Sequence, residues 1–371
     1  MEKKELIGLS QSQMEELLRG WEEPAFRGRQ LYHALYRERQ WDLRKITPFP
    51  IRLREKLAEQ FQATLPAIEK QFQSVDGTAR YLLRLSDGHR IETVWMPEKE
   101  RNTLCLSTQV GCPAACLFCL TGLMGLIRNL SAGEIVGQVL LLLDHKNSGE
   151  KPAESSRTNI VFMGMGEPLL NYENVMEAVK LLADPNGVGI SLSRMTLSTS
   201  GIVPVMERLA REPVRPRLAV SLNATTDAVR DRLMPLNRKW PLAELLRACR
   251  EFPLRPRERM TFEYVLLAGV NDSLEDARLL TKLVQEIRCK VNLIGFNPGP
   301  ELPFRTPPDE HILEFERILR ERGVAAFIRK PRGRDIFAAC GQLKLMEAQN
   351  SASSAGNLTG QSAIGRSAPT A

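Results

Sequence analysis

The spacing of apolar and polar positions changes twice along the chain, and each part predicts a different kind of structure. In residues 1–62, apolar side chains such as Leu31 and Leu35 recur at helical intervals, and Ser10 stands where a helix N-cap is expected. This spacing places the apolar side chains on one face of a helix. We therefore expect a small helical module over residues 1–62.

Residues 63–98 carry turn signals between runs of β-prone residues. Asp76-Gly77 and Asp87-Gly88 are each flanked by aromatic and branched aliphatic side chains. Asp-Gly pairs are typical of tight hairpin turns, because glycine adopts the positive φ that these turns require. A short antiparallel sheet over residues 63–98 is expected to link the helical module to the remainder of the chain.

From residue 99 the pattern becomes a strand followed by a helix, repeated along the chain. Helix start signals precede three of the amphipathic runs, namely a capping box of Ser131 with Glu134, then Pro241 and Ser273. The expected strands are Thr103–Thr108, Asn159–Met163, Met195–Thr199, Arg217–Leu222, Thr261–Leu267 and Val291–Phe296, and a seventh, Ala325–Arg329, follows an expected helix over Asp309–Arg322. Serial strand–helix units predict an α/β domain over residues 99–346, with a parallel sheet in an open or closed barrel.

The remaining segments bear on location. Residues 347–371 are rich in Ser, Ala, Gly and Thr and predict a disordered tail. The longest aliphatic run, Leu140–Leu143, is far shorter than the roughly 20 apolar residues of a membrane span. Met1–Leu6 is too charged for the start of a signal peptide. We expect a cytoplasmic protein that does not associate with a membrane.

Charge adds a moderate indication of a polyanionic partner. The net charge is +7 at pH 7, and residues 211–260 hold twelve Arg and Lys against six Asp and Glu. Lys and Arg contacts to phosphate dominate nucleic-acid affinity. The helical module, the 211–259 stretch and the cluster at 329–334 are candidate phosphate contacts, although a solvated basic surface explains the charge equally well.

The cysteines indicate metal or redox chemistry. Cys105, Cys112, Cys116 and Cys119 lie within fifteen residues, which is unlike a disulfide framework in a cytoplasmic chain. The last three have the spacing C-x3-C-x2-C directly after the first strand of the α/β domain. Three thiolates from one loop leave a metal position open to a substrate, whereas a closed structural site needs four ligands. A zinc loop with Cys105 as the fourth ligand, or plain buried thiols, are the alternatives.

Polar residues end several of the expected parallel strands. Gly166 and Glu167 follow the second strand, where glycine allows the backbone to approach a ligand and the carboxylate can accept a hydrogen bond. Three later strands end in polar stretches, at Ser198, at Ser221–Asn223 and at Asn297. Carboxyl ends of parallel strands share one rim, so a polar ligand site is expected there.

These motifs carry a resemblance. The cysteine loop after the first strand resembles the radical S-adenosylmethionine (SAM) superfamily, in which three cysteines hold a [4Fe–4S] cluster and the fourth iron binds SAM. The following segments look like the RlmN/Cfr family of RNA methyltransferases: residues 107–112 (STQVGC), 161–170 (VFMGMGEPLL), 197–204 (LSTSGIVP), 233–239 (LMPLNRK), 261–267 (TFEYVLL), 290–298 (KVNLIGFNP) and 338–343 (AACGQL). The resemblance runs from about Pro24 to Leu343 and implies a partial (β/α)6 radical-SAM barrel.

The resemblance also implies residue roles. Cys112, Cys116 and Cys119 would hold the cluster, and the SAM contacts would be Gly166, Glu167, Ser198, Ser221, Leu222, Asn223 and Asn297. Cys340 would carry a methyl group taken from one SAM, Cys105 would be its disulfide partner, and Glu92 would accept a proton. Without the family motif, Cys340, which follows two alanines, is typical of a buried small residue. The family usually has His at position 223 and an acidic residue at position 337, where this chain has Asn223 and Phe337.

The activity implied is methylation of RNA, with two SAM molecules per turnover. RlmN-type members methylate C2 of an adenosine in the peptidyl-transferase centre of 23S rRNA and of the adenosine 3′ of the anticodon in tRNA. Cfr-type members methylate C8 of the same rRNA base. The N-terminal extension favours C2, but the motifs are shared. We expect a monomer that receives its electron from a donor such as flavodoxin. Two alternatives belong to other functional classes: a SAM-cleaving activase of another enzyme, and a non-catalytic zinc RNA-binding module.

Overall fold

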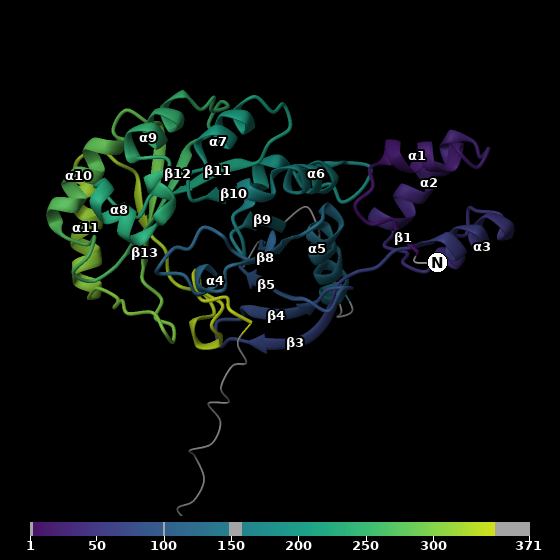
Figure 1. Cartoon of the computed structure of the whole chain (residues 1–371), viewed down its shortest axis with the longest axis horizontal. Coiled ribbons are helices and arrows are strands. Elements are labelled where there is room, and N and C mark those ends of the chain that lie inside the picture. Colours follow the sequence, from purple (N-terminus) through teal and green to yellow (C-terminus); the bar gives the residue numbers. More distant parts are fainter. Residues whose placement is uncertain (1–2, 99–100, 148–157, 346–371) are drawn as a thin grey trace, which may run out of the picture.

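The computed structural model describes residues 3–98, 101–147 and 158–345. The predicted tail over residues 347–371 lies outside these residues. The N-terminal part consists of three helices and one short strand pair, which lie to one side of the large sheet (Figure 1). Their bounds are β1 Lys4–Glu5, α1 Gln11–Arg19, α2 Ala25–Tyr36, α3 Ile51–Gln60 and β2 Phe61–Gln62, with β1 and β2 parallel. The predicted helices of this region are confirmed.

Close packing holds this helical module together and joins it to the barrel. Ser10 caps α1 in a capping box with Gln13. A Cβ on Gly28 of α2 would lie 2.4 Å from the Cα of Glu15, so only glycine permits this approach of α1 and α2. Asp144, in α5 (Ala132–Asn147) of the barrel, accepts hydrogen bonds from Arg39 and Trp41 at 3.1 and 2.8 Å.

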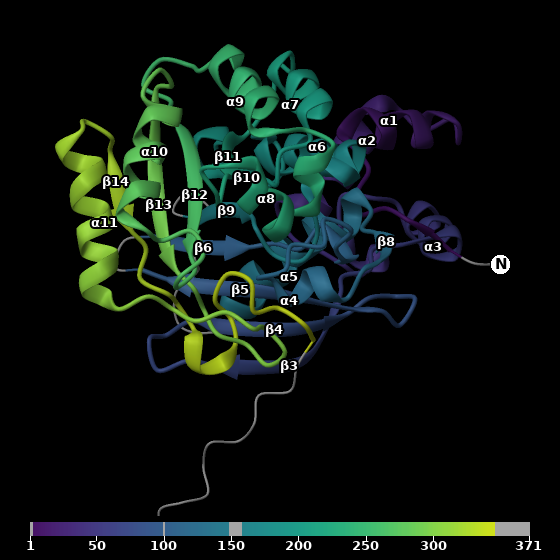
Figure 2. The same ribbon diagram turned by 60° about the vertical axis from the view of Figure 1, so that its left-hand side comes forward.

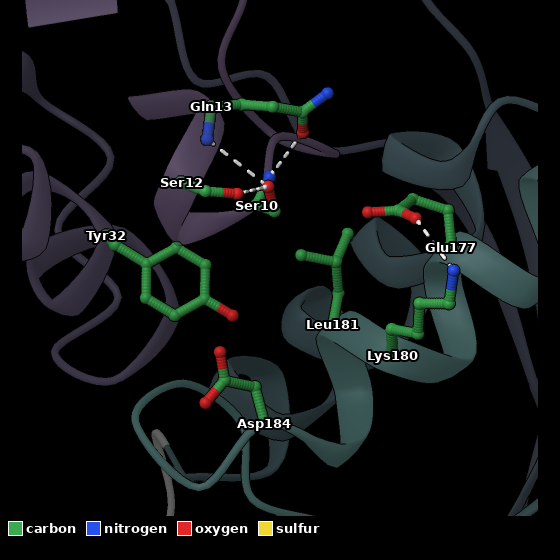
Figure 3. Close-up of a pocket in the computed structure, with 8 residues that line it drawn as sticks. All are labelled: Ser10, Ser12, Gln13, Tyr32, Glu177, Lys180, Leu181 and Asp184. Atoms are coloured by element: carbon green, nitrogen blue, oxygen red, sulfur yellow. Dashed lines mark hydrogen bonds and ion pairs between the residues drawn. The ribbon is translucent and has the colours of Figure 1, made fainter. Parts of the chain in front are cut away.

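A hollow between the module and α6 (Tyr172–Ala183) is lined by side chains from both, as Figure 3 shows. The Tyr32 hydroxyl points toward the Asp184 carboxylate, and Lys180 lies 3.7 Å from Glu177. Burial first, and then the charge of Asp184, raises the pKa of Tyr32. The lining contains none of the residues predicted for the active site.

The antiparallel strands β3 Ala67–Gln73, β4 Ala79–Arg84 and β5 Arg90–Pro97 form two hairpins. Their turns contain Gly77 and Gly88 at φ 83° and 86°, as the Asp-Gly pairs predict. Strand β5 continues by pairing antiparallel with β6, the first strand of the barrel. The hairpins therefore extend the barrel sheet instead of forming a separate one.

One ten-stranded sheet results, in the order β14-β13-β12-β11-β10-β9-β6-β5-β4-β3. Its seven parallel strands match the seven predicted ones: β6 Asn102–Cys105, β9 Thr158–Phe162, β10 Met195–Thr199, β11 Arg217–Ser221, β12 Met260–Leu266, β13 Cys289–Gly295 and β14 Ala326–Ile328. Besides α5 and α6, the helices between them are α7 Val203–Ala210, α8 Asp227–Leu233, α9 Leu242–Glu251, α10 Leu274–Val284 and α11 Asp309–Glu321. Strand β14 does not pair with β6, so the barrel is partial.

The two faces of the sheet differ in polarity. Side chains alternate along a strand, and residues paired in register point the same way. Phe262 and Tyr264 belong to the face covered by helices, because both are fully buried and Tyr264 stacks on Phe315 of α11 at 5.7 Å. The register then assigns the following residues to the opposite, inner face: Glu92, Cys105, Val161, Ser198, Ala219, Ser221, Glu263 and Asn292. Four residues of the predicted site thus share one face.

The chain after β14 crosses this inner region to the antiparallel strands, where it lies beside β3 and β4 (Figure 2). Hydrogen bonds fasten it there: the Ser74 hydroxyl donates to Asp335 at 2.6 Å, and the Gly333 amide donates to Asp76 at 3.0 Å. Within the described residues, no helix is long and apolar enough to cross a membrane.

Candidate active site at the carboxyl ends of the parallel strands

The cysteine loop is anchored on both sides. It leaves strand β7 (Gln109–Gly111), which pairs with β8 (Leu126–Asn129). Gly111 has φ 78°, and a Cβ there would lie 1.9 Å from the Gly125 carbonyl oxygen, so this turn requires glycine. The Cys112 amide donates to that same oxygen at 2.8 Å, and the Leu117 amide donates to the Leu233 carbonyl of α8 at 2.9 Å. The backbone of the loop is thus held before any cofactor binds.

The three thiols of the loop lie close enough to influence one another. Burial raises the pKa of Cys112 to about 12, and the charges of Glu167 and Cys119 add to this effect. Burial also raises the pKa of Cys116 well above its usual value, followed by the charges of Cys119 and Cys112. The raised pKa values favour the protonated thiols. Metal coordination favours the deprotonated form instead, since thiols bind metals as thiolates.

Glu167 connects two strand ends. Its carboxylate accepts hydrogen bonds from both the amide and the hydroxyl of Ser200 at 2.7 Å, and from the Leu169 amide at 3.1 Å. Gly166, at φ 109°, packs so closely that a Cβ would lie 2.7 Å from the Thr108 hydroxyl. Both residues therefore have structural partners, while Glu167 retains lone pairs for a further donor.

The predicted SAM contacts at the ends of β10 and β11 differ in their burial and in the hydrogen bonds that they already make within the protein. Ser198 and Ser221 are half-buried on the inner face. Leu222 is fully buried in the core, and its amide and carbonyl bond to Glu263 and Arg230. The Asn223 side chain accepts from the Val265 amide at 2.8 Å and donates to a methionine sulfur at 3.4 Å. The Asn223 amide thus stabilises the loop itself, at φ 57°.

Cys340 is carried by a segment that bonds to both the rim and the cysteine loop. The Asn297 amide donates to the Cys340 carbonyl at 3.3 Å, and Gln342 donates to the Pro298 carbonyl at 2.7 Å. The carbonyl of Gly341 accepts from the Leu120 amide at 2.8 Å. The segment that was predicted to carry the methyl group is therefore fixed next to the predicted cluster ligands.

The thiols of Cys340 and Cys105 are both free, and Cys340 is solvent-exposed as a residue whereas Cys105 is buried. Desolvation of the thiol by the surrounding protein, followed by the negative charges of Glu263 and Cys119, raises the pKa of Cys340 to about 11. Burial also raises the pKa of Cys105, and the charge of Cys340 adds to this increase.

Glu92 lies on the same face in a fully buried ion pair. Both its side chain and that of Arg80 are inaccessible to solvent, and the Arg80 guanidinium donates to one carboxylate oxygen. The other oxygen, Oε2, has no hydrogen-bond partner at normal geometry within the described residues, and the backbone amides of Lys344 and Leu345 lie close enough to lower the pKa of the carboxylate. Burial raises the pKa of Glu92, and the charge of Arg80 opposes this effect. A raised pKa with one unbonded oxygen suits a general base.

Arg230, on α8, belongs to this site and was missed by the sequence analysis. It is 1% exposed and donates to the carbonyls of Ser200, Ser221 and Leu222 and to the side chain of Asn237. Burial lowers its pKa to about 10. Arg230 is one of four charged residues in the seven-residue helix α8, a composition typical of a solvated surface, so no local signal marks it. The motif LMPLNRK, which contains Asn237, was the only hint.

Comparisons with known proteins agree with this geometry. Residues 106–280 match the radical SAM superfamily, and residues 4–63 match the ribosomal RNA large subunit methyltransferase N-terminal domain. A probable dual-specificity RNA methyltransferase RlmN from Koribacter versatilis is 54% identical over 341 residues, which cover 88% of this chain and 97% of the relative. The chain belongs to the RlmN family.

Two further comparisons extend over most of the chain. The dual-specificity RNA methyltransferase RlmN of Rhodospirillum rubrum is 50% identical, with 91% of this chain and 80% of that protein covered. The crystal structure of a radical SAM methyltransferase from Sphaerobacter thermophilus has a TM-score of 0.87 at 45% identity and covers 92% of this chain and 100% of that one. The chain is therefore a radical-SAM RNA methyltransferase of the RlmN family, as its motifs predict.

Radical-SAM chemistry in the RlmN family implies a [4Fe–4S] cluster and SAM, and the residues present fit both. Within the described residues, no group of three or more His, Cys, Asp and Glu side chains is placed to hold a single metal ion. Ligands of a cluster stand further apart, because each thiolate binds a different iron. The buried Oδ1 of Asn297 accepts no hydrogen bond in the described part of the chain, so it is open to a donor group of SAM.

Proposed function

We propose that this protein methylates C2 of an adenosine in the peptidyl-transferase centre of 23S rRNA, and C2 of the adenosine 3′ of the anticodon in tRNA, through an S-methylated Cys340. The observation that carries the proposal is the attachment of the Cys340 segment to the cysteine loop, where the Leu120 amide donates to the Gly341 carbonyl at 2.8 Å; the charge of Cys340 also acts on the Cys105 thiol. Further support comes from relatives named as dual-specificity RNA methyltransferases at 54% and 50% identity.

Cofactor binding is assigned to the rim. Cys112, Cys116 and Cys119 would hold the cluster, and the cluster would bind SAM beside them. Gly166, Glu167, Ser198, Ser221, Leu222, Asn223 and Asn297 surround SAM. Leu222 and Asn223 act mainly through backbone and loop shape, since Leu222 is in the core and the Asn223 amide is bonded within the protein. Asn297 contributes its unbonded oxygen.

The chemistry requires a radical route because the ring carbons of adenine are electrophilic and do not attack the methyl group of SAM. A bound cluster with SAM supplies a 5′-deoxyadenosyl radical. Cys340 would accept a methyl group from a first SAM. After a second SAM is cleaved, this S-methyl group would give one hydrogen atom to the 5′-deoxyadenosyl radical and bond to C2 of the base, and the surplus electron of the adduct would return to the cluster. Glu92 would take the proton from C2. The Cys105 thiolate would then attack the Cys340 sulfur: the bond between that sulfur and the methylene carbon breaks, the carbon takes a proton to become the methyl group of the released RNA, and a Cys105–Cys340 disulfide remains.

The target base has to be unstacked to reach Cys340, and phosphate contacts are assigned to the basic surfaces of the N-terminal helices and of residues 211–259 and 329–334. A low-potential donor such as flavodoxin supplies the electron. Action as a monomer in the cytoplasm completes the proposal.

The decisive experiment is anaerobic reconstitution with iron and sulfide, followed by reaction with SAM, dithionite and a 23S rRNA fragment or a tRNA. We expect 5′-deoxyadenosine and 2-methyladenosine by mass spectrometry. Formation of 8-methyladenosine would replace the C2 assignment by C8 methylation. Zinc without iron and sulfide in the anaerobically purified protein, or no 5′-deoxyadenosine with RNA present, would overturn the proposal.

A further inference from the structure

Arg230 carries its positive charge into the interior of the protein without a hydrogen-bonded carboxylate. Its guanidinium donates at 2.7 and 3.1 Å to the carbonyls of Ser200 and Ser221, and its Nε donates at 3.0 Å to Leu222. Its remaining bond, at 2.8 Å, goes to the side-chain oxygen of Asn237. All four acceptors are neutral. A buried charge normally has an ionic partner, because its desolvation is costly.

The helix that carries Arg230 contacts the cysteine loop directly. One turn after Arg230, the Leu233 carbonyl accepts the 2.9 Å hydrogen bond from Leu117, the residue that follows Cys116. Leu233 and the next residue, Met234, form a small buried cluster against which Cys116 and Phe118 pack.

We propose that Arg230 is a positioning residue of the cluster site: it ties the carboxyl ends of β10 and β11 together and provides a permanent positive charge beside Cys116 that favours the reduced cluster. The inference rests on the proposed function, since it requires the cluster. Three thiolates and the cluster carry net negative charge, and reduction adds one electron from a low-potential donor. No bond or proton changes at Arg230.

The two parts of this role predict different results for two substitutions. R230Q removes the charge and most of the hydrogen bonds, whereas R230K keeps the charge but cannot reach three carbonyls in the planar geometry of a guanidinium. We expect the equilibrium constant for reduction to fall at least tenfold in R230Q, which is a midpoint potential more negative by about 59 mV. R230K is expected to keep a potential near that of the wild type and to bind SAM more weakly.

The measurement is an anaerobic redox titration of the reconstituted full-length protein, monitored by electron paramagnetic resonance without RNA. The matched control is R215Q. Arg215 is equally buried, with 3% of its side chain exposed, but it lies at the opposite end of the strands and pairs with Glu258. R215Q is expected to lose stability and keep the wild-type potential.

A wild-type potential in R230Q, or equal shifts in R230K and R230Q, would overturn the inference. If neither Arg230 variant retains a cluster, the D231N variant is the deciding test. The negative charge of Asp231 acts on Arg230, and D231N removes this charge while Arg230 stays in place. D231N is expected to shift the potential to a less negative value, and an unchanged potential would contradict the role of charge. A wild-type protein that binds no iron–sulfur cluster would instead contradict the proposed function.

Discussion

The two ends of the parallel strands each bury an arginine, and they treat it in opposite ways. At the amino ends, Arg215 forms a two-pronged ion pair with Glu258 at 3.0 and 3.2 Å, and its guanidinium lies 4.6 Å from the centre of the Phe252 ring. At the carboxyl ends, Arg230 donates only to neutral oxygens. The same residue type therefore has a hydrogen-bonded carboxylate at one end and only neutral hydrogen-bond partners at the other.

This difference shows at which end of the strands polar groups remain available to bind a ligand. The amino-end pair satisfies both partners, so it serves stability alone. The carboxyl end keeps the unpaired charge of Arg230, the unbonded Oδ1 of Asn297 and the three free thiols of the cysteine loop. Parallel α/β barrels place their active sites at this end. Substitutions at the two ends should accordingly affect different properties.

The strongest test of this contrast is Cys340→Ala. We expect RNA methylation to fall below detection, because the acceptor of the first methyl group is lost, while iron content and SAM binding stay at the wild-type level. Mass spectrometry of the RNA and iron analysis measure the two outcomes. The control is Cys289→Ala at the amino end of β13, which should retain activity. Full activity of Cys340→Ala would reject the assigned mechanism.

Cys105→Ala is expected to block the same reaction one step later. With no thiol to attack Cys340, the protein should remain covalently attached to the RNA and stop after one turnover. Denaturing gel electrophoresis with labelled RNA detects the adduct. A variant that releases methylated RNA at the wild-type rate would remove Cys105 from the reaction.

At the amino end, Glu258→Gln should act on stability. It leaves the buried Arg215 without its partner, and breaking a buried pair costs about 3–5 kcal/mol of unfolding free energy. Denaturant unfolding measures this cost, and the activity per folded molecule should stay near that of the wild type. Glu251→Gln, which breaks the exposed pair with Arg247, is the surface control and should be close to neutral. Loss of methylation without loss of stability in Glu258→Gln would contradict the contrast between the two ends.

The smallest expected effect is a shift of the pH profile through the pair of Arg80 and Glu92. Glu92 acts as a base only when ionised, and its pKa is raised above 4.5, so activity should decline on the acidic side at a higher pH than for an ordinary glutamate. Arg80→Met removes the charge that opposes this increase and should move the decline to still higher pH. Arg80→Lys should lie between the two. The pH profile is measured as the rate of RNA release in a single turnover. If activity declines at the same acidic pH in the wild type and in both Arg80 variants, Glu92 is not the group that takes the proton.

Local sequence patterns predicted most of the fold. The two Asp-Gly turns, the capping boxes at Ser131 and Ser273 and the seven parallel strands are all present. These features depend on interactions between residues close together in the chain, so the sequence displays them directly. The continuity of the antiparallel strands with the barrel sheet was not predicted, because strand pairing depends on contacts between distant segments.

The features of the site also fall into those that the sequence predicted and those that only the folded structure shows. The sequence by itself determined the cysteine spacing, the polar residues at the strand ends and, through its motifs, the family. Only the tertiary structure decided that the segment of Cys340 bonds to the cysteine loop, that the Asn223 amide is bonded within its own loop, and that Arg230 is buried at the rim. A residue's type and neighbours in the chain set its chemistry, but its burial and charge environment also come from segments more than two hundred positions away, which only folding brings together.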